Sequence, residues 1–83
     1  MNGMDETGVK SAFGIRLRVL RTRRGWTQET LAAASGLDVT YVSSCERGHR
    51  NVGLVNICRL ADALDVSPSS LFSEWHVSSG ADE

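Results

Sequence analysis

The sequence predicts an all-α domain of five helices. In two long stretches, apolar residues recur every three or four positions, as they do along one face of an amphipathic helix. Residues that favour helix caps stand before several of the predicted helix starts. No stretch alternates apolar and polar residues as a half-buried strand would. The 83 residues are enough for one small domain with a single core.

The first helix is predicted over residues 11–24, with Gly25 ending it. One face of this helix follows the i, i+4, i+7 spacing and consists of Phe13, Leu17, Leu20 and Arg24. Ile15 and Val19 form a second apolar pair, which would either widen the core face or belong to a contact surface. Residues 1–10 are polar and aperiodic, and they predict a flexible N-terminal tail.

Two short helices are predicted next, over residues 28–35 and 39–47. Thr27 and Asp38 can cap their N-termini, and Gly36 between them can take a positive φ at little cost. Two short helices joined by a tight turn are the layout of a helix-turn-helix, whose second helix enters the major groove of DNA.

The fourth helix is predicted over residues 54–64, with Gly53 as its N-cap. Its predicted apolar stripe consists of Leu54, Ile57, Cys58, Ala61 and Leu64. Both Cys45 and Cys58 fall at positions expected to face inward, so we interpret them as small buried residues, with a structural disulfide between them as the alternative. The cysteines form no CxxC pair and the histidines have no partner at metal-ligand spacing, so we expect no metal site and no cofactor.

The fifth helix is predicted to begin with Ser67 as N-cap and Pro68 at the first position, and to end near Trp75. One small domain cannot easily bury every apolar residue of this region, and exposed apolar clusters usually mark interfaces. The predicted dimer interface is Leu71, Phe72, Trp75 and Val77. The alternative is that these side chains cap the core of the monomer. Residues 78–83 are predicted to be a flexible tail, which leaves residues 11–77 as the domain.

Charge is distributed unevenly along the chain. The formal net charge is −1, yet every lysine and arginine lies between Lys10 and Arg59. Nine basic residues oppose three acidic ones in that segment, which gives it a charge of +6. A basic body with acidic ends can present a positive face to nucleic acid, and ordinary solvated surface charge is the alternative interpretation.

Other classes of function lack support in the sequence. No apolar run approaches the length of a membrane span, and the acidic, polar N-terminus does not resemble a secretory signal, so we expect a cytoplasmic protein. No nucleophile elbow, phosphate-binding loop or other catalytic signature is present, and an enzyme is therefore not expected.

A helical wheel divides residues 39–47 into two faces. Val42, Cys45 and Glu46 point toward the predicted core. The opposite face and its flanks are the candidate DNA-reading surface: Val39, Thr40, Tyr41, Ser43, Ser44 and Arg47. Hydroxyl groups can donate or accept hydrogen bonds at base edges, and a methyl group can pack on thymine. A plain solvated helix face is the alternative.

Three residues around this helix are candidates for phosphate contacts. Gln28 stands at a helix N-terminus, where free N–H groups favour a phosphate. Its side chain could instead brace the helix predicted over residues 39–47, or Gln28 could be a generic helix-start residue. Arg50 and Asn51 follow the reading helix in a loop that can track the DNA backbone. Glu46 is expected to pair with an arginine of the first helix, such as Arg21, because phosphates would repel its carboxylate.

Several spaced blocks of sequence resemble the lambda-repressor-like helix-turn-helix domains (Cro/C1-type, xenobiotic-response-element family). The blocks are Phe13-Gly14 followed by RLRVLRTRRGWTQETLA, then SGLDVTYVSSCERG, then LVNICRLADALDVSPSSLF, and they cover residues 11–72. Within this family, the segment most similar to the controller proteins of restriction–modification systems is TYVSSCERGHRN.

The resemblance implies a small homodimeric transcriptional regulator that binds a pseudo-palindromic operator in double-stranded DNA, with RNA polymerase as a possible further partner. It assigns contacts with bases or the adjacent sugar-phosphate to Thr40, Tyr41 and Ser43. It assigns phosphate contacts to Gln28, Arg50 and Asn51. A phage- or plasmid-type repressor, or an antitoxin that neutralises a protein partner, are the alternative functions.

Overall fold

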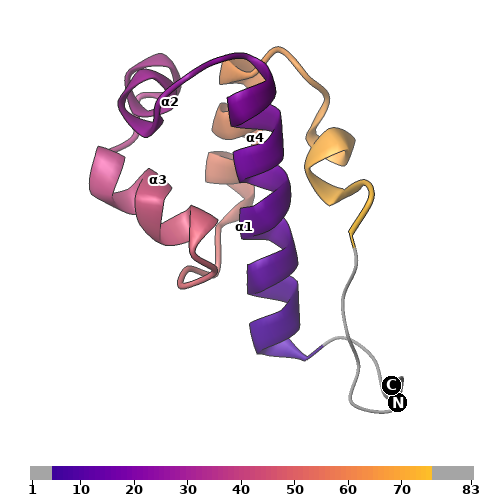
Figure 1. Cartoon of the computed structure of the whole chain (residues 1–83). Helices are drawn as coiled ribbons and strands as arrows, with labels where there is room; N and C mark the ends of the chain where they lie inside the picture. The colour runs from indigo at the N-terminus through magenta and orange to yellow at the C-terminus, as the bar shows by residue number, and fades with distance from the viewer. Residues whose placement is uncertain (1–4, 76–83) are drawn as a thin grey trace.

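The computed structural model describes residues 5–75, and all its regular elements over that range are helices, which confirms the predicted all-α class (Figure 1). Its elements are α1 (Glu6–Arg23), α2 (Gln28–Ser35), α3 (Val39–Glu46), α4 (Leu54–Ala63) and a 3-10 helix, η1 (Pro68–Phe72). Among these helices none is long and apolar enough to cross a membrane.

The prediction of a fifth α-helix was wrong, because that segment forms only the short 3-10 helix η1. Pro68 does occupy the first position, but the hydroxyl of Ser67 bonds to neighbouring serine hydroxyls and caps no backbone N–H. Ser73 is extended and Glu74 takes a φ of 60°, which ends the helix before Trp75. A single turn of this type cannot extend an apolar stripe over several residues.

Helix α1 begins at Glu6 and not near Ser11, so the prediction of a flexible tail over residues 1–10 was wrong for its second half. The carboxylate of Asp5 caps the helix by accepting the N–H of Gly8 at 2.8 Å. Lys10 pairs with Glu6 at 2.9 Å, one helical turn away. The polarity of this segment therefore belongs to a solvated helix start.

The two short helices begin where the sequence predicts. Thr27 caps α2 by accepting the N–H of Thr30 at 3.1 Å, and Asp38 caps α3 by accepting the N–H of Thr40 at 2.9 Å. Gly36 ends α2 with a φ of 74°, a left-handed conformation that costs glycine little. The turn between α2 and α3 is thus specified by residues that lie close to it in the sequence.

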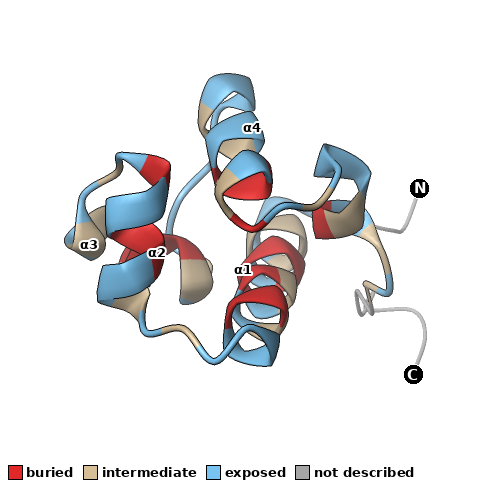
Figure 2. Ribbon diagram, turned by 90° about the horizontal axis from the view of Figure 1, so that it is seen from above, coloured by how far each residue is buried: buried red, intermediate tan, exposed pale blue. Residues whose placement is uncertain are grey.

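The core joins all five elements, and Figure 2 shows a buried stretch in each of them. It consists of Phe13, Leu17, Leu20, Leu31, Ala32, Val42, Cys45, Leu60, Ala61, Leu64 and Leu71. Three of the four residues predicted on the inner face of α1 belong to this core, as does Cys45.

Helix α4 buries a narrower face than predicted. Its inner residues are Ile57, Leu60, Ala61 and Leu64, whereas Leu54 is 77% exposed and Cys58 is exposed. On another side of the helix, Asn56 donates a hydrogen bond to the hydroxyl of Tyr41 in α3. The packing of Leu60 and Ala61 in the core and this hydrogen bond together leave Leu54 and Cys58 toward solvent, so the inward placement of Cys58 was wrong. Both cysteines are free thiols.

Gly14 allows α1 to lie against the end of α3. A Cβ atom at this position would lie 2.6 Å from the carbonyl oxygen of Glu46 and still closer to that of Cys45. Both obstacles are backbone atoms of a packed helix, so they cannot rotate away as a flexible side chain could. Glycine is therefore required here by the close approach of two helices.

We expect Gly14→Ala to destabilise the fold by about 1–3 kcal/mol, because the added methyl group overpacks the contact between α1 and α3. The same change in an unobstructed helix interior would stabilise by up to about 1 kcal/mol, so the sign of the effect is diagnostic. Urea unfolding monitored by circular dichroism would measure it. Ser11→Ala on the exposed face of α1 is the control, and a Gly14→Ala protein at least as stable as wild type would contradict the prediction.

Candidate nucleic-acid interface

Helix α3 packs against α1 and α2 and keeps its other side on the surface of the molecule (Figure 2). Val42 and Cys45 lie in the core, as the helical wheel predicts. Thr40 and Arg47 are exposed, and Ser43 between them is half-buried. The guanidinium of Arg47 donates a hydrogen bond to the Ser43 hydroxyl one turn away. A stripe of short hydroxyls ending in a cation therefore faces outward.

The placement of Ser44 on this outer stripe was wrong, because the residue is buried. The loop after α3 folds back over it: the N–H of His49 donates to the Ser44 carbonyl at 3.0 Å, and Arg50 Nε donates to the Ser44 hydroxyl at 3.2 Å. Val39 and Tyr41 are half-buried flanks of the stripe and pack against the core.

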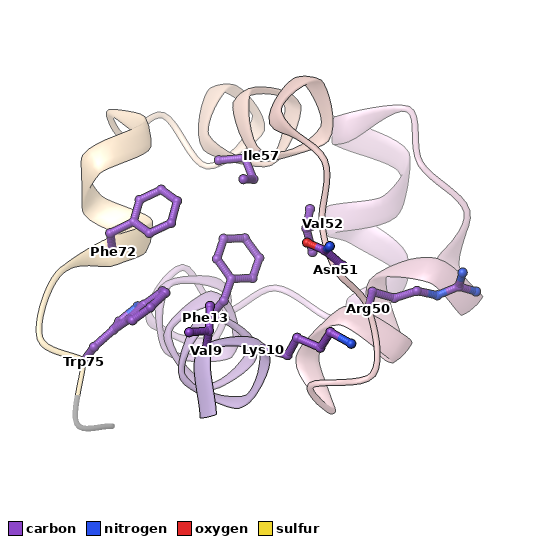
Figure 3. A pocket seen from close by; sticks show the side chains of 9 residues that line it. All are labelled: Val9, Lys10, Phe13, Arg50, Asn51, Val52, Ile57, Phe72 and Trp75. Atoms are coloured by element: carbon purple, nitrogen blue, oxygen red, sulfur yellow. The ribbon is translucent and has the colours of Figure 1, made fainter. Parts of the chain in front are cut away.

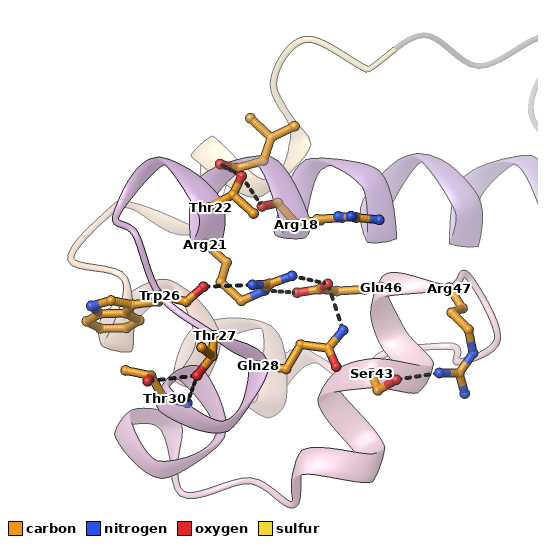
Figure 4. A network of polar contacts seen from close by, with 11 residues as sticks. Arg18, Arg21, Thr22, Trp26, Thr27, Gln28, Thr30, Ser43, Glu46 and Arg47 are labelled. Atoms are coloured by element: carbon orange, nitrogen blue, oxygen red, sulfur yellow. Dashed lines mark hydrogen bonds and ion pairs between the residues drawn. The ribbon is translucent and has the colours of Figure 1, made fainter.

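A buried ion pair holds α3 against α1 (Figure 4). Arg21 and Glu46 meet through two parallel hydrogen bonds, with Nε 2.6 Å from Oε2 and Nη2 2.9 Å from Oε1. Their side chains are only 10% and 4% exposed. Arg21 also donates to the carbonyl of Trp26 at 2.7 Å. The pairing predicted from the sequence is thus confirmed.

Hydrogen bonding of the Arg21 guanidinium to the Glu46 carboxylate, which accepts from it, is the main reason that the pKa of Arg21 is raised above its usual value. Burial works in the opposite direction, because low polarity disfavours a charged group. The hydrogen bond prevails, and the charged form of Arg21 is favoured despite its burial.

Gln28 joins the same network from the first turn of α2. Its amide donates to Glu46 Oε1 at 3.1 Å (Figure 4). The side chain therefore braces α3, which confirms one of the three interpretations made for this residue from the sequence. One carboxylate thus links α1, α2 and α3. A phosphate contact by Gln28 stays a prediction.

The residues after α3 form an exposed polar loop beside the reading stripe. Arg50 and Asn51 are exposed, as a role in phosphate binding requires. The Arg50 guanidinium lies 5.3 Å from the centre of the Tyr41 ring, within the range of a cation–π contact. The hydroxyl of Tyr41 is bound by Asn56 of α4 at 3.1 Å. Asn56 was missed by sequence reasoning, since it is a single amide among the apolar residues of α4.

The predicted dimer patch is only partly on the surface. Leu71 is fully buried in the monomer, so its assignment to an interface was wrong. Phe72 is 47% exposed, and Trp75 is half-buried with its indole N–H bonded to the Leu71 carbonyl at 2.9 Å. Val77 lies outside the described residues.

An open apolar hollow of about 220 Å³ adjoins Phe72 (Figure 3). Phe13, Phe72 and Trp75 gather on one side of it, with Lys10 and Asn51 across from them. The hollow therefore connects the apolar surface beside η1 with the polar loop after α3. In the described part of the chain, no group of three His, Cys, Asp or Glu side chains could hold a metal ion.

Comparisons with known proteins agree with this geometry. The chain matches the helix-turn-helix domain family over residues 12–71. It is 43% identical over 67 residues to control protein C.MunI of a Mycoplasma species, across 80% of this chain and 90% of that protein. It is 42% identical over 67 residues to a hypothetical transcription factor of Neisseria meningitidis, of which it spans 63% while 81% of this chain is covered.

Among solved structures, the chain is similar to the restriction–modification controller protein C.AhdI from Aeromonas hydrophila. The identity is 59% and the TM-score 0.76, with 77% of this chain and 97% of that chain covered. A second controller, C.Esp1396I, is 34% identical with a TM-score of 0.71, over 77% of this chain and 82% of that one.

We expect Glu46→Ala to destabilise the protein by about 3–5 kcal/mol, because it leaves the Arg21 guanidinium buried without its partner. Glu46→Gln keeps the shape of the side chain but not its charge, and it should lower the free energy of unfolding by less than Glu46→Ala does. Urea unfolding of each variant would measure the loss. Glu29→Ala, which removes an exposed carboxylate from α2, should stay within about 0.5 kcal/mol of wild type. A Glu46→Ala protein as stable as the Glu29→Ala control would refute the role assigned to the pair.

Proposed function

Since the chain belongs to the helix-turn-helix domain family of transcriptional regulators, we propose that it is a restriction–modification controller protein that binds a pseudo-palindromic operator in double-stranded DNA. The observation that carries the proposal is the outward stripe of α3, held in place from behind by the buried pair of Arg21 and Glu46. The similarity to named controllers supports the finer assignment. The proposal includes no catalytic activity and places the protein in the cytoplasm with its DNA.

In this proposal α3 enters the major groove. Thr40 and Ser43 present hydroxyls to base edges, and Val39 offers methyl groups to thymine. Arg47, at the end of the stripe, is long enough to reach a base edge or a phosphate. The stripe has no long amide or guanidinium fork in its first turn, so the shape of the operator carries part of the specificity.

The phosphates on either side of the groove are contacted by residues outside the stripe. Arg50 and Asn51 are exposed beside it and meet the backbone directly. Gln28 stands at the N-terminus of α2, where the helix dipole favours an anion, and its bond to Glu46 fixes it there. These contacts set the register of the protein on DNA and give affinity without reading sequence.

A second copy of the chain completes the proposal. Phe72 and Trp75 would lie in the contact, and the hollow beside Phe72 offers an apolar recess for side chains of the partner. On α4, which packs against η1, Leu54 and Val55 are 77% and 65% exposed and extend the apolar surface. A two-fold dimer would place the two α3 helices about 34 Å apart, one turn of DNA. RNA polymerase is a further partner of such a regulator at a promoter.

The first test is selection of duplexes from a random-sequence library, followed by binding of the selected and a scrambled duplex over a range of salt. Thr40→Ala should weaken the binding free energy for the selected duplex, and only for that duplex, by about 1–3 kcal/mol, because it removes a contact with a base edge. Arg50→Ala should weaken binding to both duplexes and lower the slope of log K against log salt by about one unit.

Thr40→Ala is a clean variant because the side chain is exposed and the backbone N–H that Asp38 caps is kept. Binding that does not respond to salt would rule out the proposed phosphate contacts. The affinities for the selected and the scrambled duplex give a ratio. If Thr40→Ala leaves this ratio unchanged and Arg50→Ala abolishes it, the surfaces that read bases and contact phosphates have been assigned the wrong way round. Genes for a methyltransferase and an endonuclease beside this gene would support the controller role.

The dimer is tested by Phe72→Glu, which places a charge within the proposed contact. Wild-type protein should sediment as a dimer at tens of micromolar, and the variant as a monomer with an unchanged helical spectrum. Ala33→Glu is the control, since Ala33 is exposed on α2, which contributes no residue to the hollow beside Phe72. Wild-type protein that remains monomeric with and without DNA would disprove the dimer.

A further inference from the structure

We infer that Arg16 of α1 is a positioning residue for self-association, because its guanidinium holds in place the residues that present Phe72 to a second copy of the chain. The inference rests on the dimer of the proposed function and adds to it a residue outside the contact itself. Arg16 belongs to the basic segment of the chain, yet its side chain is only 10% exposed. Its guanidinium is therefore bound within the protein and is not displayed on the surface as a phosphate contact would be.

The Arg16 guanidinium contacts the chain on both sides of Phe72. Its Nε atom donates a hydrogen bond to the carbonyl oxygen of Ser70 at 2.8 Å. Its Nη1 atom lies 3.6 Å from Oε1 of Glu74, within the range of an ion pair. Ser70 precedes Phe72 by two residues and Glu74 follows it by two. One side chain of α1 thus joins the two ends of segment 70–74, whose middle residue is Phe72.

Segment 70–74 has weak support of its own. Helix η1 ends within it, and a 3-10 helix has poorer hydrogen-bond geometry than an α-helix. The carbonyl oxygen of Ser70 is 3.4 Å from the backbone nitrogen of Ser73, a longer distance than to Arg16. Glu74 then takes a φ of 60°, a left-handed conformation that is unfavourable for a residue other than glycine. The two contacts from Arg16 therefore supply the restraint that holds this segment against α1.

The position of Phe72 sets the shape of the apolar surface around it. Its ring centre is 5.9 Å from that of Phe13 in α1 and 5.4 Å from that of Trp75. All three rings line the hollow shown in Figure 3. A displaced segment 70–74 would move Phe72 away from Phe13 and change the recess that the partner has to fit. An apolar contact that is ordered in advance loses less entropy on association, so fixing the segment favours the dimer.

Sedimentation equilibrium of the full chain tests this role. Arg16→Met keeps the unbranched apolar stem but removes both contacts. It should raise the dissociation constant of the dimer by about three- to tenfold, because side chains of segment 70–74 must then be ordered on association. Arg16→Lys keeps the charge but has no planar fork to reach both acceptors, so it should give an intermediate value. Arg18→Met, the same chemical change at an exposed position of α1, is the matched control and should keep the wild-type constant.

Two further measurements separate self-association from other roles of a buried arginine. A thermal melt at a concentration well below the dissociation constant reports on the monomer. A role in folding alone would lower this melting temperature and leave the dissociation constant unchanged. Binding to a duplex that carries one half of the selected palindrome reports on phosphate contacts. On this half-site Arg16→Met should keep the wild-type slope of log K against log salt, since Arg16 meets no phosphate.

Three outcomes would overturn the inference while leaving the proposed DNA binding intact. They are a wild-type dissociation constant in Arg16→Met, an equal rise in Arg18→Met, and a half-site salt slope that falls by about one unit, which would make Arg16 a phosphate contact. A wild-type protein that stays monomeric with and without DNA would instead disprove the dimer, and this inference with it. Failure to select any duplex would overturn the proposed DNA binding but not the result on self-association.

Discussion

The structure depends above all on the buried pair of Arg21 and Glu46. A charge without a partner inside so small a core would be costly, so each of these groups constrains the other to one geometry. The fork of the guanidinium fits the carboxylate through two parallel bonds, which fixes the rotation of α3 as well as its distance from α1. Gln28 bonds to the same carboxylate and brings α2 into the same arrangement. The buried contacts of Glu46 on the inner side of α3 thus set the direction in which its outer stripe faces.

Close packing and polar bonding act on the same contact. Gly14 permits α1 to touch the backbone of Glu46 at the end of α3, and the side chain of the same Glu46 pairs with Arg21 two turns farther along α1. A larger residue would separate the helices and lengthen the two hydrogen bonds. Farther along, the loop after α3 folds over Ser44, and α4 reaches Tyr41 through Asn56. Helix α3 is therefore held from three directions, while its outer stripe faces away from the rest of the molecule.

Local chemistry made much of the fold predictable. The caps by Thr27 and Asp38 depend on residues two or three positions away, so the sequence alone places the starts of α2 and α3 correctly. The pairing of Glu46 with Arg21 followed from the side of the helix on which the carboxylate lies. Ser44 and Cys58 were misplaced because their exposure depends on a returning loop and on the rotation of α4, which are set by long-range contacts. A serine followed by a proline can begin either a 3-10 helix or an α-helix. These residues therefore do not distinguish the two, and η1 was misassigned for that reason.

The contrast between the two thiols makes this chain convenient for spectroscopy. Burial raises the pKa of the Cys45 thiol, and because the thiolate is the reactive form, Cys45 is protected from alkylating dyes in the folded protein. Cys58 is exposed, and at two residues' distance it lies on nearly the opposite side of α4 from Asn56. A fluorophore attached there would leave the groove-facing stripe clear while standing beside the apolar surface of α4. The unaltered sequence thus contains a single-site probe that can report on self-association and on DNA binding in the same sample.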